Sequence, residues 1–369
     1  MGLSVPLQND VSQRVKGKRN LITDVAGVKV GQKTVNIGKV HSGVTAIFPH
    51  TGNLFRQKVP AASYVINGFG KSVGLIQIDE LGTIETPIVL TNTFAVGTAV
   101  NALTRRMLRD NPEIGDTTST VNPVVMECND GDVSDIRAMA LTETDVASAL
   151  DAGSRTLTEG AIGAGRGMMC YDLKGGIGSA SRIVTVDDAH QYTLGALVMT
   201  NYGFLQDLVI DGIPIGAPLS DLLAADKRKE EKGSIITILA TDAPLNSRQL
   251  RRLAKRATVG INRTGGFIGN GSGEIVLAFS TANLVAHFPS TQFDTVTRFN
   301  DNQIDLFFRA TAATVDEAVL SSLVHAESVV DRKGRRRLSL VDAAKQLRAQ
   351  RPGNSEMVRQ VFEKLGVTE

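Results

Sequence analysis

A run of charged residues leads directly into a core-like apolar segment, and this junction constrains the fold more than any other stretch. Lys227 to Lys232 are six consecutive charged residues, and Gly233-Ser234 joins them to the apolar run Ile235–Ala240. A charged run is well solvated, whereas β-branched residues without a turn signal indicate a buried strand. We therefore expect Ser234 to begin a rigid core strand, with a mobile loop before it.

Cleavage of the Gly233-Ser234 bond would place a free α-amine beside the Ser234 hydroxyl. An α-amine has an ordinary pKa of about 7.7 to 8, so it can accept a proton near neutral pH. It could then serve as the general base for the adjacent nucleophile. On this stretch alone, a loop-to-strand junction that merely contains Gly-Ser stays open as the alternative.

The composition is that of an ordinary globular protein. The chain has 369 residues, 42% hydrophobic and 21% charged, which suits two domains or one large layered domain. A net charge of +2 gives no electrostatic reason to expect nucleic acid or a membrane as a partner. Cys128 and Cys170 lack CxxC spacing, so we expect buried thiols, which fit a reducing compartment. The N-terminus has no apolar signal region and no stretch could span a bilayer, so we expect a cytoplasmic protein.

Alternating strand-like and helix-like patterns predict an α/β protein. The expected strands are residues 89–93, 123–126, 192–200, 235–240 and 275–280. The expected helices are residues 95–108, 142–158, 246–264 and 314–330, with two short helices in residues 340–366. The glycine-rich residues 160–182 follow no clear strand, which indicates closely packed backbones instead of a dinucleotide site. The basic residues 331–337 are expected to form a solvated loop.

Polar residues at the ends of expected strands are the candidates for chemistry. Glu127 could hold a substrate ammonium group, and the amide of Asn201 could donate to a developing oxyanion. Ser272 and Glu274 are two residues apart, so on an extended chain both project to one side and could orient an ammonium or relay its proton. Each residue also has a plain structural alternative as a hydrogen-bonded turn residue.

Several separate motifs, in order, resemble the DmpA-like family of L-aminopeptidase/D-esterases and β-peptidyl aminopeptidases. The resemblance runs from about Asn20 to about Val330. Its motifs are NLITDVAGVKVG from Asn20, TNT from Thr91, GAGRGMMCYDLKGGIGSASR from Gly163, the strand ending at Asn201, GSIITILATDAP from Gly233 and GSGEIVLAFSTAN from Gly271.

The resemblance implies one four-layer αββα domain of the DmpA/ornithine-acetyltransferase type. It also implies a precursor that cleaves itself between Gly233 and Ser234, giving fragments 1–233 and 234–369. The expected activity is removal of N-terminal residues from small peptides, amides or esters, without metal or organic cofactor. Homo-oligomers, in the family's case tetramers of processed protomers, are expected.

The resemblance also assigns roles to the candidate residues. Ser234 matches the nucleophile, with its new α-amine as base, and Ser272 and Glu274 match the residues that hydrogen-bond that amine. Asn201 matches the oxyanion donor, and Glu127 matches the acid that holds the substrate's free ammonium group.

One position departs from the family pattern. Asn129 stands where some characterised aminopeptidases of the family carry a tyrosine that assists the oxyanion, and this difference bears on the substrate range. Ser234 itself favours an aminopeptidase over the family's nylon-type oligoamide hydrolases, whose nucleophile is threonine. Two alternatives stay open: a hydrolase or acyltransferase for amides without a free amine, and a non-catalytic oligomeric homologue.

Overall fold

The computed structural model describes residues 15–223, 231 and 233–367. The polar N-terminal segment up to residue 14 and the charged run, except for Glu231, therefore lie outside the described residues. Within the described ranges, no helix has both the length and the apolar character that a membrane-crossing segment needs.

Two β-sheets lie at the centre of the molecule. The smaller sheet has the order β1-β2-β5-β6, with β1 Lys29–Ile37, β2 Val40–Phe48, β5 Ile88–Asn92 and β6 Val124–Cys128. The larger sheet has the order β13-β3-β12-β11-β10-β9, and β4 pairs with β3 at its side. Its strands are β3 Gln57–Gly68, β4 Thr83–Ile84, β9 Ile177–Thr185, β10 Gln191–Asn201, β11 Ser234–Thr241, β12 Gly273–Ser280 and β13 Val285–Ala286.

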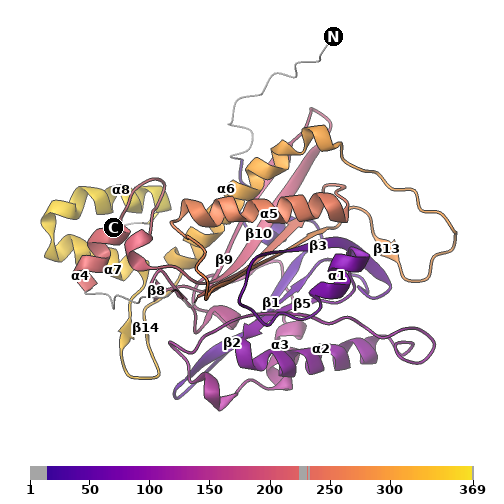
Figure 1. Ribbon diagram of the computed structural model, residues 1–369, viewed down its shortest axis with the longest axis horizontal. Coiled ribbons are helices and arrows are strands. Elements are labelled where there is room, and N and C mark those ends of the chain that lie inside the picture. The colour runs from indigo at the N-terminus through magenta and orange to yellow at the C-terminus, as the bar shows by residue number, and fades with distance from the viewer. Residues whose placement is uncertain (1–14, 224–230, 232, 368–369) are drawn as a thin grey trace, which may run out of the picture.

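Helices cover the outer face of each sheet (Figure 1). The pair α2 (Val96–Asp110) and α3 (Glu143–Asp151) packs on the smaller sheet, and the pair α5 (Ser247–Arg263) and α6 (Asp305–Val324) packs on the larger one. A third apolar core fills the space between the two sheets. The remaining helices are α1 Leu75–Leu81, α4 Gly216–Leu223, α7 Leu340–Gln350 and α8 Ser355–Leu365. The predicted αββα sandwich is confirmed.

The strand that was predicted to begin at Ser234 is β11, and it lies in the middle of the larger sheet. β11 pairs parallel with β12 and antiparallel with β10, and every one of its residues is buried. A strand covered on both faces needs apolar side chains on both, which explains why Ile235–Ala240 reads as a continuous run instead of an alternation. Each fully buried isoleucine or leucine in it contributes about 1.5 to 3 kcal/mol to folding.

Glycines in the stretch 160–182 let the layers approach closely, as predicted. A Cβ atom added to Gly178 on β9 would lie 2.0 Å from the Ala318 carbonyl oxygen on α6. A Cβ added to Gly165 would lie 2.5 Å from the Ile177 backbone nitrogen. Neither neighbour is the end of a flexible side chain, so only glycine fits these positions without moving the backbone.

Three of the predicted elements have different boundaries. Helix α3 was predicted to run to Thr158, but it ends at Asp151. Helix α6 ends at Val324 and begins nine residues before the predicted start at Thr314. Thr314 is buried and donates its hydroxyl to the Ala310 carbonyl, so it is an interior residue and no cap. The basic residues 331–337 were predicted as a solvated loop, but they form a hairpin whose strands are β14 (Val329–Val330) and β15 (Arg336–Arg337). Asp331 is buried there and accepts from the Arg335 and Arg337 side chains.

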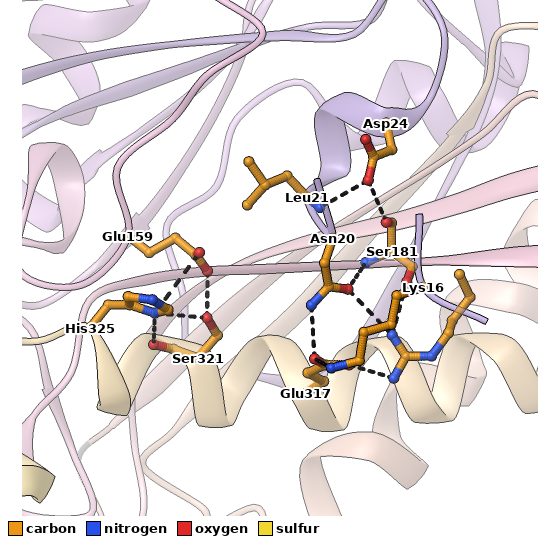
Figure 2. Close-up of polar contacts among 10 residues, drawn as sticks. Lys16, Asn20, Leu21, Asp24, Glu159, Ser181, Glu317, Ser321 and His325 are labelled. Atoms are coloured by element: carbon orange, nitrogen blue, oxygen red, sulfur yellow. Dashed lines mark hydrogen bonds and ion pairs between the residues drawn. The ribbon is translucent and has the colours of Figure 1, made fainter. Parts of the chain in front are cut away.

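Hydrogen bonds and ion pairs connect the segment before β1, which includes Lys16 and Asn20, to β9 and α6 (Figure 2). Glu317 on α6 accepts hydrogen bonds from Lys16 at 2.6 Å and from the Asn20 side chain at 2.8 Å, and it pairs with Arg182 of β9. Asn20 in turn accepts from the Ser181 backbone nitrogen at 3.0 Å. This network joins the start of the described chain to its last third.

Candidate active site

Ser234 is the first residue of β11 and lies between two other functional strand ends. Its register partner on β10 is Asn201, and its partner on β12 is Gly273. Directly opposed residues of an antiparallel pair project from the same face, so the side chains of Ser234 and Asn201 lie on one side of the sheet. The Ser234 side chain is almost fully buried. The structure thus brings together the nucleophile and the oxyanion donor that the sequence predicted separately.

The carbonyl before Ser234 is held by the sheet. The Gly273 backbone nitrogen donates to the Gly233 carbonyl oxygen at 3.1 Å, which continues the β11–β12 ladder by one residue. This donor is aimed at the oxygen of the bond that was predicted to be cut, and it could stabilise negative charge there. A Cβ on Gly233 would lie 2.5 Å from the Asn201 carbonyl oxygen and 2.5 Å from Tyr202 Cα, so glycine is required at this position.

Asn201 lies at the wall of a cavity of about 620 Å³ beside the Gly233 end of this bond. Its side-chain oxygen accepts a hydrogen bond from the Met169 backbone nitrogen at 2.9 Å. The side-chain nitrogen makes no hydrogen bond to any described residue. The cavity wall also includes Asn129, Gly131, Asp132, Asp135, Ile136, Arg137, Met169, Tyr202, Gly203, Glu231, Gly233 and Arg332.

Ser272 and Glu274 converge as the sequence spacing predicted. The Ser272 hydroxyl donates to Glu274 Oε1, and both side chains are fully buried. The other carboxyl oxygen of Glu274 has no hydrogen-bond partner among the described residues. Burial raises the pKa of Glu274 to about 7, the Ser272 hydrogen bond acts in the opposite direction, and the charge of Glu231 raises it further. A carboxyl group that titrates near neutral pH can both accept and return a proton.

Glu127 lies on β6 of the other sheet. Its Oε1 accepts from the Lys71 backbone nitrogen at 2.8 Å, and its Oε2 accepts from the Thr93 hydroxyl. Each carboxylate oxygen has a second lone pair, so the group keeps capacity for a substrate ammonium. The nearby Asn129 is exposed, borders the cavity, and accepts from the Gly131 backbone nitrogen at 2.8 Å.

Cys128 lies near the nucleophile, and no sequence pattern indicated this. Its thiol donates to the Met199 carbonyl oxygen at 3.6 Å, and the Ser234 side chain acts to lower its pKa. Burial raises the pKa of Cys128 well above its ordinary value, so the group is a neutral thiol. A neutral buried thiol neither removes the Ser234 proton nor competes as a nucleophile.

Glu231 is the second residue that sequence reasoning missed. It belongs to the charged run that was predicted to be solvated, yet it is buried, and this part of the prediction is wrong. Its carboxylate accepts from the Gly203 nitrogen at 2.6 Å and from the Gly269 nitrogen at 2.8 Å. It therefore links the loop after Asn201 to the loop before Ser272, two residues ahead of Gly233.

In the described part of the chain, no three His, Cys, Asp or Glu side chains are placed to hold a metal ion. The site contains a hydroxyl group at the start of a strand and, one residue along the neighbouring strand, a carboxyl group with a pKa near 7. It also contains backbone and amide donors beside the Gly233 carbonyl group. These are the parts that acyl transfer through a serine requires.

Comparison with known proteins supports the same chemistry. Residues 20–337 match the model of Peptidase family S58. The beta-peptidyl aminopeptidase BapA of Sphingosinicella xenopeptidilytica is 36% identical over 334 residues, covering 85% of this chain and 82% of that protein.

Two solved structures share the fold along almost the whole chain. The PH0078 protein of Pyrococcus horikoshii OT3 is 45% identical with a TM-score of 0.85, covering 96% of both chains. The L-aminopeptidase D-Ala-esterase/amidase of Ochrobactrum anthropi, described as a prototype of the serine aminopeptidases with a variant Ntn hydrolase fold, is 36% identical with a TM-score of 0.82, covering 95% of this chain and 96% of that one. The protein is a member of Peptidase family S58.

Proposed function

We propose that this chain cleaves itself between Gly233 and Ser234 and then acts as a serine aminopeptidase of the Ntn type. It would hydrolyse N-terminal residues from small peptides, amides or esters through an acyl-enzyme on Ser234. The observation that carries the proposal is the placement of Ser234 at the start of a buried strand, between the Asn201 amide and the Gly273 backbone donor, with Glu274 one residue along β12.

Self-cleavage would proceed by an N-to-O acyl shift. The Ser234 hydroxyl oxygen attacks the Gly233 carbonyl carbon, and its proton passes to the Glu274 carboxylate, since the chain has no free α-amine at this stage. The Gly273 N–H donates to the oxyanion. The C–N bond then breaks, the Ser234 nitrogen takes up a proton, and an ester links Gly233 to the serine oxygen. Water hydrolyses that ester, giving a Gly233 carboxylate and a Ser234 with both a free hydroxyl and a free amine.

Peptide turnover would use the new amine as the base. The Ser234 α-amine takes the hydroxyl proton, the oxygen attacks the substrate carbonyl, and the Asn201 side-chain nitrogen donates to the oxyanion. Ser272 and Glu274 hold the amine and tune its basicity. Glu127 binds the substrate's ammonium group, which restricts cleavage to the N-terminal residue. The acyl-enzyme is then hydrolysed by water.

The substrate class follows from the relatives' activities, which are β-peptidyl aminopeptidase for one and L-aminopeptidase, D-Ala-esterase and amidase for another. Assembly into tetramers of processed protomers and a cytoplasmic location stay predictions from the resemblance.

The intact mass of the denatured protein tests self-cleavage directly. We expect two fragments, residues 1–233 and residues 234–369, with Ser234 at the new N-terminus. A single chain that stays whole after long incubation would contradict the proposal and favour the non-catalytic homologue.

Glu127→Gln tests the aminopeptidase assignment. We expect kcat/KM for a substrate with a free amine to fall about 10- to 100-fold, because a charge-assisted hydrogen bond to the ammonium is lost. The N-acetylated form of the same substrate has no ammonium group for Glu127 to bind. Its slow cleavage should therefore have the same kcat/KM in Glu127→Gln and in the unaltered protein. Glu85→Gln is the matched control, since Glu85 is also buried but pairs with Lys58. Efficient cleavage of the blocked substrate by the unaltered protein would favour a hydrolase or acyltransferase for amides without a free amine.

A further inference from the structure

Lys174 is a fully buried lysine that the proposed mechanism does not use. It is the last residue of β8 (Leu173–Lys174), which forms a short hairpin with β7 (Met169–Cys170) inside the glycine-rich stretch. Its side-chain nitrogen donates to the carbonyl oxygens of Met168 and, at 3.3 Å, Gly175. Among the described residues, no carboxylate lies within ion-pair distance of it. Burying a lysine side chain whose hydrogen bonds go only to backbone carbonyls costs folding free energy. A functional role would explain why a lysine lies at this position.

The carbonyl that Lys174 binds belongs to the same peptide group that orients Asn201. The Met168–Met169 peptide offers its carbonyl oxygen to Lys174 and, at 3.1 Å, to the Gly175 nitrogen. Its N–H, on the opposite edge, donates to the Asn201 side-chain oxygen at 2.9 Å. The peptide group is planar, so fixing the direction of its carbonyl also fixes the direction of its N–H. A donor on the carbonyl polarises the whole group and strengthens the N–H as a donor.

The orientation of the Asn201 amide decides whether it can stabilise an oxyanion. The two ends of an asparagine amide have nearly the same shape and are distinguished by their hydrogen-bond partners. The Met169 N–H selects the oxygen end, which leaves the nitrogen end without a partner among the described residues, at the cavity beside Gly233. A flipped amide would present an oxygen to the oxyanion and repel it.

We propose that Lys174 is a positioning residue that fixes the Met168–Met169 peptide group and thereby holds the Asn201 amide in its oxyanion-donating orientation. The inference rests on the proposed role of Asn201. Burial, followed by the charge of Arg166, lowers the pKa of Lys174 to about 7, while Cys170 and Asp130 act in the opposite direction. The ammonium and the neutral amine both carry N–H donors, so the bond to Met168 persists in either state.

A double-mutant cycle on the self-cleaved enzyme tests this role. Lys174→Met shortens the side chain by one bond and removes its donors. We expect kcat to fall about tenfold with KM nearly unchanged, which is part of the loss expected when an oxyanion donor is removed. In the Asn201→Ala background the same substitution should change kcat by less than about twofold, because there is no amide left to orient. Lys174→Gln retains a donor one bond shorter and should recover part of the lost kcat. If Lys174→Met does not fold, Lys174→Gln takes its place in the double-mutant cycle with Asn201→Ala.

The controls separate this inference from the proposed function. Lys58→Met, which removes a half-buried lysine paired with Glu85, should leave kcat unchanged. An equal loss of kcat from Lys174→Met in both backgrounds, with Asn201→Ala itself strongly impaired, would overturn the role of Lys174 alone. An Asn201→Ala enzyme with unchanged kcat would overturn the role of Asn201 and the inference together.

Discussion

Replacing Ser234 with alanine is expected to yield one uncut chain without peptidase activity. The substitution removes the oxygen that attacks the Gly233 carbonyl carbon. Because the chain then stays uncut, the free α-amine at residue 234 does not form either. Removing the nucleophile of a serine hydrolase costs up to about 10⁶ in kcat, and here both the nucleophile and the base are lost. Intact mass and turnover of a free-amine substrate, measured on the same preparation, check both effects.

Ser280→Ala is the matched control for this result. Ser280 is also buried, but it lies at the other end of β12 and donates its hydroxyl to the Ala243 carbonyl at 2.6 Å. Its loss should lower stability without preventing cleavage. If Ser234→Ala were cut at the same bond, the acyl shift through this hydroxyl would be wrong.

Replacing Glu274 with glutamine is expected to slow self-cleavage about 10²- to 10⁴-fold, the range typical of a lost general base. Only the deprotonated carboxylate accepts the Ser234 proton, and burial raises the pKa of this group to about 7. The cleavage rate of freshly refolded precursor should therefore rise with pH up to and through about 7, and then level off. In Glu274→Gln this rise should be absent. Time courses of intact mass between about pH 5 and 9 give both rates.

The neighbours of Glu274 should move this pH profile in opposite directions. Ser272 donates to the carboxylate and lowers the pKa of Glu274, so Ser272→Ala should shift the rise to higher pH. The charge of Glu231 raises the pKa of Glu274, so Glu231→Gln should shift the rise to lower pH. A profile that none of the three substitutions moves would exclude Glu274 as the base for self-cleavage.

The sequence predicted the central elements well because their signals are local. The switch from charged to apolar residues at Gly233 marks the start of β11, and Asn246 with Gln249 forms a capping box at the start of α5. The limits of α6 were missed because the helix is buried on most sides. It lacks the one-sided apolar pattern, and interior residues such as Thr311 and Thr314 look like caps, although their hydroxyls bond carbonyls one turn earlier.

Residues that act through tertiary contacts gave no comparable signal. Glu231 is one of the charged residues from Lys227 to Lys232, and only the folded chain shows that its carboxylate accepts from two backbone nitrogens. Gly273 contributes a backbone N–H, which no side-chain pattern can mark. Lys174 lies in a glycine-rich stretch that predicted close packing, and this reading was correct but said nothing of a buried amine.

The order of strands in the larger sheet determines how the cut protein would behave when it unfolds. β11 and β12 would belong to the C-terminal fragment, yet they lie between β3 and β10, which belong to the N-terminal one. Neither fragment could dissociate without breaking both the β10–β11 and the β3–β12 backbone hydrogen bonds. The two fragments would therefore stay associated in the native state. Once denatured, they would have to find each other in solution, and refolding would become a second-order reaction that slows on dilution. The uncut Ser234→Ala chain would refold at a rate independent of its concentration.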